Sequence, residues 1–268
     1  MRAGRAVLAQ ARAEVSPEVA AAKKGDGSLP RFYRSVSVER DAHTSAWRVL
    51  LDQKALRSPQ NHPLRLPTLG LALAIASEWR WQNERRVYTY TMPLMGMAAS
   101  ATDTCEASRQ RTRDSLIRHF QTDATCCRSG EGEEGEREQE LLDPLLDWSV
   151  SIFGDRPTVS YSLAGNEHAP HVTEGALACI KSLNDWQLSA VESLSATTKS
   201  LVIALAVAKG YIEPETAVQL TRLEENLQTE HWGIVEGGHD IDLAACRARV
   251  LASTCFLRLS NPSYSLLR

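Results

Sequence analysis

The spacing of apolar and polar residues along the chain changes character near residue 93. Before that point, apolar residues alternate with polar ones in the segments 32–38 and 47–51. A period of two is typical of half-buried strands. The polar residues 52–54 suit a turn into a third short strand at 55–57, so we expect a small antiparallel sheet.

A strongly apolar helix is predicted to follow this sheet. Thr68 is a suitable N-cap for the sequence LGLALAIASEWRWQ at residues 69–82. Apolar residues cover more than half of the circumference of this helix, so we expect other elements to cover it on two sides. We expect Trp79 to pack in the core and its neighbour Glu78 to be structural as well.

From residue 93 onward the apolar residues follow the three-to-four-residue spacing of helices. Gly154 and Gly210 suit helix ends, and Pro214 suits the first position of a helix. The predicted helices are 104–121, 138–153, 172–183, 185–209, 214–230 and 241–257. The predicted fold class is therefore α+β, with a small amino-terminal domain of helix and sheet at residues 29–95 and a carboxy-terminal all-helical bundle at 96–268.

Composition and charge limit the classes of function. The 268 residues are 43% hydrophobic and 24% charged, which suits a globular protein with a full core. A net charge of −3 and a pI of about 6.2 offer no basic field to phosphates, so we expect no nucleic-acid partner. No apolar run reaches the roughly 18–20 residues of a membrane span. The six cysteines form no CxxC pair, which argues against a zinc site or a disulfide framework.

The chain begins with a basic segment. Residues 1–13 contain three arginines and no acid, which is typical of an organellar transit segment, although serine is absent and acids follow soon after. A frayed cytosolic tail explains the same residues equally well. Residues 23–30 contain glycine and proline and suit a linker, so folded structure is expected to begin near Arg31. The transit and linker interpretation covers residues 1–28.

The sequence lacks the common motifs for nucleotide, metal and nucleophile chemistry. It contains no GxxxxGK[ST], GxGxxG or GxSxG, so we expect no bound nucleotide and no other cofactor. His168 and His171 have the HxxH spacing of a metal site. However, Pro170 lies between them and a third ligand at a suitable spacing is missing, so we expect no metal.

One group of residues supports an enzyme hypothesis. Glu224 or Glu225 could form an acid–base group with His239 and Asp240, as a small-molecule hydrolase would need. Carboxylates on a helix are more often solvated or ion-paired. A His-Asp pair more often caps the helix that follows it. We therefore assign no catalytic residue and keep the hydrolase as an alternative.

Protein binding explains the segment RLEENLQTEHWGIVEGGHD, residues 222–240, better. On the predicted helix Leu223 and Leu227 lie on an apolar stripe, whereas Glu224 and Gln228 lie one turn apart on another face. One face can therefore pack while the other remains free for a partner. The candidate partner-binding residues are Glu224, Glu225, Gln228, Trp232, His239 and Asp240.

Four further features of the sequence have structural interpretations. Trp232 could also be a core anchor at the end of its helix, and Gly233 can adopt the positive φ that ends it. We expect Gly233 and Trp148 to be structural. The acidic run at residues 130–140 suits a solvated loop that leads into a helix start, and we assign it no function.

Taken together, many short segments in this order and spacing resemble one known family, over nearly all of residues 31–257. These segments are RFYRSVSV at 31–38, ALRSP at 55–59, Glu78 with Trp79, YTMPL at 90–94, Asp103, Thr122 and Asp123 with Arg128, DPLLDW at 143–148, Phe153 with Gly154, KSLVIALA at 199–206, RLEE at 222–225 with Gln228, Trp232 with Gly233, and His239 with Asp240. The family is that of the ATP12-type chaperones, which hold the free alpha subunit of the mitochondrial F1-ATPase before it joins beta.

The resemblance implies a function and a location. It implies an assembly chaperone of the mitochondrial matrix whose partner is the F1-ATPase alpha subunit, and which has no cofactor and no enzymatic activity. It also implies that the carboxy-terminal bundle consists of crossing, orthogonal helices, and it favours the transit-segment interpretation of residues 1–28. A scaffold or adapter that binds other partners remains an alternative.

The sequence departs from the family pattern at three places. Cys127 stands where the family usually has an aromatic residue, and Leu142 stands where a tryptophan is frequent. The acidic loop at 130–140 is longer than usual. These departures bring the local packing into question, whereas the segments around Trp79 and Glu224 are intact.

Overall fold

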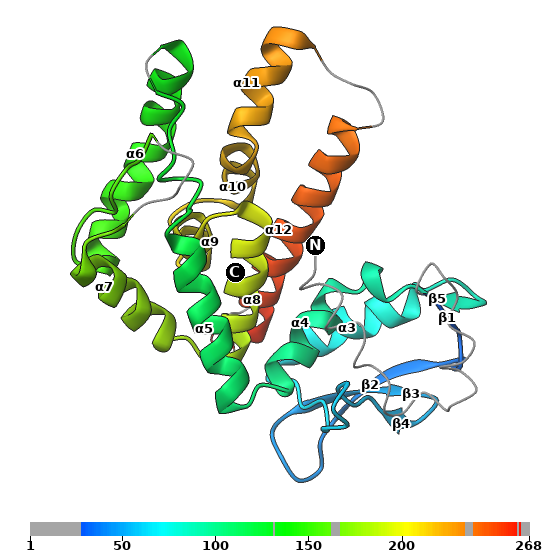
Figure 1. Ribbon diagram of the computed structural model, residues 1–268. Helices are drawn as coiled ribbons and strands as arrows, with labels where there is room; N and C mark the ends of the chain where they lie inside the picture. The colour runs from blue at the N-terminus through cyan, green and yellow to red at the C-terminus, as the bar shows by residue number, and fades with distance from the viewer. Residues whose placement is uncertain (1–27, 131, 162–166, 234–237, 262, 264–268) are drawn as a thin grey trace. The chain divides into compact units, whose positions relative to one another are not determined.

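The computed structural model describes residues 28–130, 132–161, 167–233, 238–261 and 263 (Figure 1). The chain divides into two compact units: unit 1 holds the residues up to Cys105 and from Cys255 onward, and unit 2 holds Glu106–Thr254. This division differs from the boundary after residue 95 that we expected, and the limits of folding domains stay a prediction. The expected transit segment lies outside the described residues except for its last position.

Unit 1 contains two small antiparallel sheets. The strands of the larger one are β2 (Val36–Arg40), β3 (Trp47–Leu51) and β4 (Lys54–Ala55), and those of the smaller one are β1 (Leu29–Pro30) and β5 (Arg86–Val87). Asp52 and Gln53 form the two-residue turn between β3 and β4, with φ values of 48° and 70°. Positive φ at both central residues matches the right-handed twist of a hairpin. The predicted sheet is confirmed, although its third strand begins one residue earlier than expected.

Helix α3 (Leu69–Arg80) packs against β2 and β3. Its predicted N-cap is confirmed, because the Thr68 hydroxyl accepts a hydrogen bond from the amide of Leu71 at 3.1 Å. The expected cover on two sides is confirmed, because the helix contacts both the sheet and the following helix, but one edge stays open, where Leu69 is 41% and Leu73 50% exposed. The side that faces the sheet and the following helix is fully packed, as the burial of Ile75 shows.

Two elements between α3 and residue 104 were not among the predicted helices. They are the short 3-10 helix η1 (Thr89–Thr91) and the helix α4 (Pro93–Thr102), which contacts α3. Helix α4 begins with Pro93 at its first turn, where a missing amide costs nothing. Its sequence is rich in Ala and Met and buries residues around most of its circumference, so it carries no clear polar face for a periodicity argument to detect.

The regular elements described in unit 2 are all helices, joined by loops that include one isolated bridge between Cys127 and Ser160. Its helices are α5 (Glu106–Phe120), α6 (Glu133–Phe153), α7 (Pro170–Lys181), α8 (Asp185–Thr198), α9 (Leu201–Ala208), α10 (Pro214–Thr221), α11 (Leu223–Trp232) and most of α12 (His239–Ser260). Helix α9 lies at the centre, in contact with α5, α6, α8 and α10. The ends predicted at Gly154 and Gly210 are confirmed, with φ values of 87° and 72°.

The single helix predicted for residues 185–209 is wrong, because α8 and α9 are separate. Lys199 adopts a left-handed conformation with φ 55°, and the Ser200 hydroxyl then caps α9 by accepting from the amide of Ile203 at 3.0 Å. The buried carboxylate of Asp123 accepts from two further amides of the same helix start. These acceptors satisfy amides that a continuous helix would have bonded to its preceding turn.

The single helix predicted for residues 214–230 is also wrong. Helix α10 ends before Arg222 and α11 begins after it, with Arg222 at φ −106° and ψ 16° between them. The Arg222 side chain is buried, at 6% exposure, and it contacts Glu225 of α11 and the backbone carbonyl of His239. The helix therefore breaks where a charged side chain enters the packed interior. The spacing of apolar residues does not predict such a buried charge.

Candidate functional site

The candidate partner-binding residues lie on α11 and at the start of α12. Leu223 and Leu227 on α11 are buried, while Glu224 and Gln228 are exposed, as the helical spacing predicted. The Gln228 side-chain amide donates a hydrogen bond to Oε1 of Glu224 at 3.3 Å. Glu224 and Gln228 therefore present one connected polar surface to solvent, which is available to a partner.

Arg222 connects α11 to α12, and it was not among the candidates. Its Nη1 pairs with Oε2 of Glu225 at 2.7 Å, and its Nη2 donates to the backbone carbonyl of His239 at 3.2 Å. Glu225 is therefore partly engaged within the molecule, whereas Glu224 forms no ion pair among the described residues. The signal in the sequence was an arginine three residues before Glu225, a spacing at which two side chains of a helix can pair.

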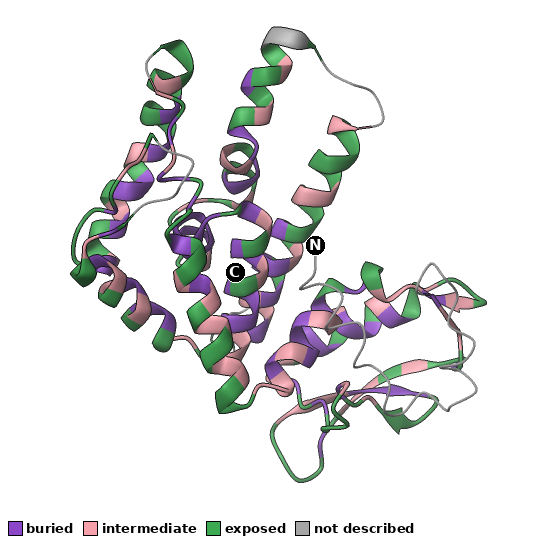
Figure 2. Ribbon diagram, viewed as in Figure 1, coloured by how far each residue is buried: buried purple, intermediate pink, exposed green. Residues whose placement is uncertain are grey.

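The first turns of α12 expose both acidic and apolar side chains. Asp240 is exposed, and Ile241 and Leu243 are 60% and 43% exposed. Leu251 two turns further on is also 43% exposed, and Figure 2 shows that burial increases toward the end of the helix. The hydrophobic period of the sequence predicted this helix but not its exposed apolar residues. Exposed apolar residues beside carboxylates are a feature of surfaces that bind other proteins.

One of the candidate residues, Trp232, is described only in part. Trp232 is the last residue of α11, but its side chain lies outside the described residues, and so do residues 234–237. Both interpretations of Trp232 therefore stay predictions. Gly233 ends α11 with φ 84° and ψ 170°, a conformation that glycine adopts far more readily than other residues.

The remaining residues expected to be structural have well-defined neighbours. Trp79 is 9% exposed and meets the ring of Tyr33 edge to face at 5.5 Å. Trp148 on α6 stacks on Tyr211, with ring centroids 4.7 Å apart and planes 12° apart. Stacking of this kind adds about 0.5–1.5 kcal/mol beyond the area buried. We keep the structural assignment of both tryptophans as a prediction for mutational tests.

Glu78 caps the start of α4. Its two carboxylate oxygens accept from the amides of Leu94 and Met95, each at 2.8 Å. Burial raises the pKa of Glu78 from its ordinary value of 4.5 to about 7, and the two amide hydrogen bonds oppose this shift without cancelling it. Glu78 therefore joins α3 to α4 through a carboxyl group whose charge changes near neutral pH.

The pKa of Glu78 predicts a pH-dependent difference in stability between the wild-type chain and Glu78→Gln. Because the folded-state pKa is raised, the folded protein binds this proton more tightly than the unfolded chain does. The contribution of Glu78 to stability is fully present below about pH 4.5 and is lost as the pH rises to about 7. Urea unfolding of both proteins across this window measures the difference. A constant difference across the window would contradict this account of Glu78.

The two histidines with metal-like spacing are engaged separately. His168 is buried, and its Nδ1 accepts from the amide of Thr158 while its Nε2 donates to the carbonyl of Phe120. These two bonds identify a neutral imidazole that fills a structural position. His171 is exposed and pairs with Asp155 at 3.0 Å. No group of three metal-binding side chains is found within the part of the chain that the structure describes.

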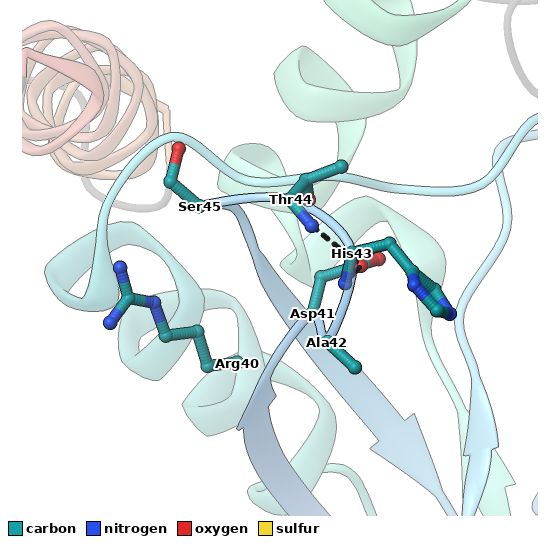
Figure 3. Close-up of a pocket in the computed structure, with 6 residues that line it drawn as sticks. All are labelled: Arg40, Asp41, Ala42, His43, Thr44 and Ser45. Atoms are coloured by element: carbon teal, nitrogen blue, oxygen red, sulfur yellow. Dashed lines mark hydrogen bonds between the residues drawn. The ribbon is translucent and has the colours of Figure 1, made fainter.

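A surface hollow lies in unit 1, on the loop between β2 and β3 (Figure 3). Residues Arg40 to Ser45 line it, and Figure 3 shows the Asp41 carboxylate accepting from the amides of His43 and Thr44. These hydrogen bonds lower the pKa of Asp41, with the nearby charge of Arg48 acting in the same direction. Asp41 thus shapes the loop as an ionised turn residue. The hollow contains none of Glu224, His239 or Asp240.

A Ser, His and Asp also meet in unit 1, yet their order does not suit a nucleophile. The hydroxyl of Ser58 and Nδ1 of His62 both bond to the same Asp103 carboxylate oxygen. A catalytic serine donates to a histidine, and the histidine in turn donates to the carboxylate. Asp103 here joins the turn at residues 58–62 to the end of α4, which gives this acidic residue a structural explanation.

None of the helices in the described part of the chain combines the length and the hydropathy that crossing a bilayer requires.

The chain is similar to named proteins from two yeasts. Residues 30–150 match a family described as ATP12 chaperone protein. Over 150 residues the chain is 31% identical to the protein atp12, mitochondrial, of Schizosaccharomyces pombe, which covers 53% of this chain and 52% of that protein. Over 101 residues it is 27% identical to ATP12, mitochondrial, of Saccharomyces cerevisiae, covering 34% and 31%. The chain thus spans about half the length, or less, of these yeast relatives.

The chain is also similar to two solved structures over nearly their whole length. Atp12 from Paracoccus denitrificans is 31% identical with a TM-score of 0.75, covering 87% of this chain and 98% of that one. The Atu1473 protein of Agrobacterium tumefaciens is 25% identical with a TM-score of 0.81, covering 96% and 97%. These matches confirm the predicted α+β fold, with a small antiparallel sheet region first and a largely helical remainder.

Proposed function

We propose, from the premise that this chain belongs to the ATP12 chaperone family, that it is an assembly chaperone for the mitochondrial ATP synthase. It binds the unassembled alpha subunit of the F1-ATPase and prevents its aggregation until the subunit pairs with beta. We place it in the mitochondrial matrix. The names of the two yeast relatives support a mitochondrial location, without specifying the matrix.

The surface of α11 and α12 is the observation that supports binding most directly. It combines an exposed acidic residue, Glu224, with the apolar residues Ile241 and Leu243 on the neighbouring helix start. The ion pair of Arg222 with Glu225 and its bond to His239 hold the two helix starts in one arrangement. A preorganised surface loses less conformational entropy when a partner binds. We infer that Gln228 and Asp240 take part in the same contact.

The physical basis of such chaperoning needs no energy source. A free alpha subunit exposes the surface that later meets beta, and exposed apolar surface of that kind aggregates. A holder that covers it with moderate affinity keeps the subunit soluble. The beta subunit then displaces the holder if the final interface is larger and tighter. The proposal therefore requires neither nucleotide nor covalent chemistry, and the chain is proposed not to be an enzyme.

Charge reversal at Glu224 provides the test of this site. Glu224→Lys is expected to weaken binding of the purified alpha subunit at least tenfold. The substitution replaces an exposed carboxylate at the contact with a positive charge, which repels the client groups that the carboxylate attracts. Glu225→Lys should also weaken binding, with an added loss of stability from the broken pair with Arg222. Isothermal titration with purified alpha measures affinity, and urea unfolding measures stability.

Glu174→Lys supplies the matched control, since it makes the same change at an exposed position of α7. It should leave both affinity and stability unchanged. If Glu224→Lys binds alpha as tightly as the control does, the proposed contact surface is wrong. A wild-type chain that captures other mitochondrial proteins but not alpha would favour the adapter hypothesis instead.

A further inference from the structure

Charge is distributed unevenly between the two units. Residues 28–105 contain ten Lys and Arg against six Asp and Glu, whereas residues 106–254 contain 13 against 24. The near-neutral net charge of the whole chain therefore hides a basic unit and an acidic unit. Because exposed charges act over about 8–10 Å at physiological salt, each unit presents its own sign of charge to a partner that contacts it.

Among the described residues of unit 1, several arginines have no carboxylate partner. The guanidinium of Arg31 donates to the backbone carbonyls of Tyr33 and Gln82, and that of Arg80 donates to the carbonyl of Val36. Within the described residues, Arg31, Arg80 and Arg85 form no ion pair. A backbone carbonyl positions a guanidinium but does not neutralise it, so these side chains keep a full positive charge at the surface.

The same part of unit 1 exposes large aromatic side chains. Trp81 is 83% exposed, Tyr90 68% and Phe32 48%. Trp81 follows α3 directly, Phe32 lies between β1 and β2, and Tyr90 belongs to η1. Such exposure is unusual for a tryptophan, which normally buries most of its large apolar area. Trp and Tyr are also among the residues that contribute most to protein–protein binding energy.

Hydrogen bonds fix the segments that carry these aromatic residues. The Gln82 side chain donates to Thr91 and accepts from the amide of Tyr88, which ties the end of α3 to η1. The Arg31 side chain reaches the carbonyl of Gln82 at 2.9 Å. The Tyr33 hydroxyl donates to the carbonyl of Trp79 at 2.6 Å, which ties the strand side to α3. The exposed rings are thus displayed on a cross-linked framework rather than on free ends of the chain.

We propose that the segments 31–34 and 80–91 form a second docking surface, which binds an acidic stretch of the client that also carries apolar side chains. We call this the aromatic-arginine surface, and its members are Phe32, Trp81 and Tyr90 with Arg31, Arg80 and Arg85. The aromatic rings provide apolar anchors, and the arginines pair with carboxylates through planar, bidentate contacts. This inference rests on the proposed function, because it takes the client to be the same alpha subunit.

The charge of the rest of the chain favours a protein segment over a larger polyanion. A nucleic acid or an anionic bilayer presents negative charge over a wide area, so it would also repel the acidic unit 2, which belongs to the same chain. A short acidic segment of protein can be neutralised locally by a few arginines. The acidic Glu224 surface of unit 2 would then contact a different, less acidic part of the client.

Two substitutions test the aromatic-arginine surface with the purified alpha subunit as the probe. Trp81→Ser is expected to weaken binding about tenfold, mainly through faster dissociation, because it removes an apolar anchor. Arg85→Glu is expected to slow association and to reduce the dependence of affinity on salt, because it removes an attractive charge. Surface plasmon resonance at several salt concentrations measures both rates. Neither side chain forms a contact that the fold requires, so both variants should unfold at the wild-type urea midpoint.

Matched controls lie on unit 2. Tyr161→Ser removes a ring that is 73% exposed, and Arg111→Glu reverses an exposed charge on α5. Both should bind alpha as the wild-type chain does. If Trp81→Ser and Arg85→Glu also bind alpha with wild-type rates while Glu224→Lys binds alpha more weakly, this inference is overturned and the proposed function stands.

Two other results would also overturn the inference. A wild-type chain that does not bind alpha at all would remove the proposed function and this inference with it. Alternatively, the wild-type chain could bind phosphatidylcholine vesicles containing cardiolipin, with Trp81→Ser and Arg85→Glu losing that binding but keeping wild-type affinity for alpha. That outcome would show that the aromatic-arginine surface recognises lipid.

Discussion

Replacing Asp123 with alanine is expected to lower the free energy of unfolding by about 3–5 kcal/mol. The Asp123 carboxylate is completely buried and accepts from the amides of Leu201 and Val202 at 2.7 and 3.2 Å. It also accepts from the amide and the hydroxyl of Thr125 at 2.9 and 2.7 Å. Alanine would leave these buried donors without acceptors and would leave a small cavity at the start of the central helix α9. Urea unfolding followed by circular dichroism measures the loss.

Two further variants separate this effect from general loss of a carboxylate. Asp123→Asn retains one acceptor oxygen, so it should lose clearly less stability than alanine does. Asp114→Ala removes an exposed carboxylate on α5 and should change stability by less than about 0.5 kcal/mol. If Asp123→Ala were as stable as Asp114→Ala, Asp123 could not be the group that organises the break between α8 and α9.

Gly175→Ala is expected to lower the free energy of unfolding by about 2–4 kcal/mol. Helix α7 approaches the end of α6 so closely that a Cβ at Gly175 would lie 2.1 Å from the carbonyl oxygen of Phe153 and 2.6 Å from its carbonyl carbon. Because the obstructing atoms are backbone, no side-chain rotation relieves the contact. One of the two helices must move, and the packing around the buried Phe153 ring must change with it.

Gly96→Ala is the control for the general effect of alanine in a helix. A Cβ at Gly96, inside α4, would meet no atom within 4 Å. The same substitution is therefore expected to stabilise the chain by up to about 1 kcal/mol, since alanine favours helix more than glycine does. Thermal unfolding of both variants should show melting temperatures that move in opposite directions. A rise in melting temperature for Gly175→Ala would contradict the close approach of α6 and α7.

The sequence predicted most elements of the fold because their hydrophobic periods are regular. Strands β2 and β3, helix α3 with its Thr68 cap, and the helix end at Gly154 depend on local signals that the sequence carries directly. The two helix breaks do not. Lys199 and Arg222 show no glycine or proline signal, and the breaks depend on Asp123 and His239, which are distant in sequence. Tertiary contacts of this kind override helix propensity.

The candidate site was predictable in part. The helical spacing identified Glu224 and Gln228 as outward-facing residues, because their position relative to Leu223 and Leu227 is a local property. The role of Arg222 and the exposure of Ile241 depend on how α11 and α12 meet, which periodicity does not specify. The exposure of Trp81 was missed for a similar reason, since a tryptophan at the end of an apolar helix is usually buried.

Light scattering by the isolated alpha subunit tests the central claim most directly. Purified alpha subunit of the F1-ATPase is diluted from denaturant into buffer without nucleotide, with and without an equimolar amount of this chain. The account predicts that scattering is suppressed near equimolar amounts, and that adding beta releases the chain as alpha pairs with beta. Aggregation of alpha at the same rate and to the same extent in the presence of the chain would contradict the account.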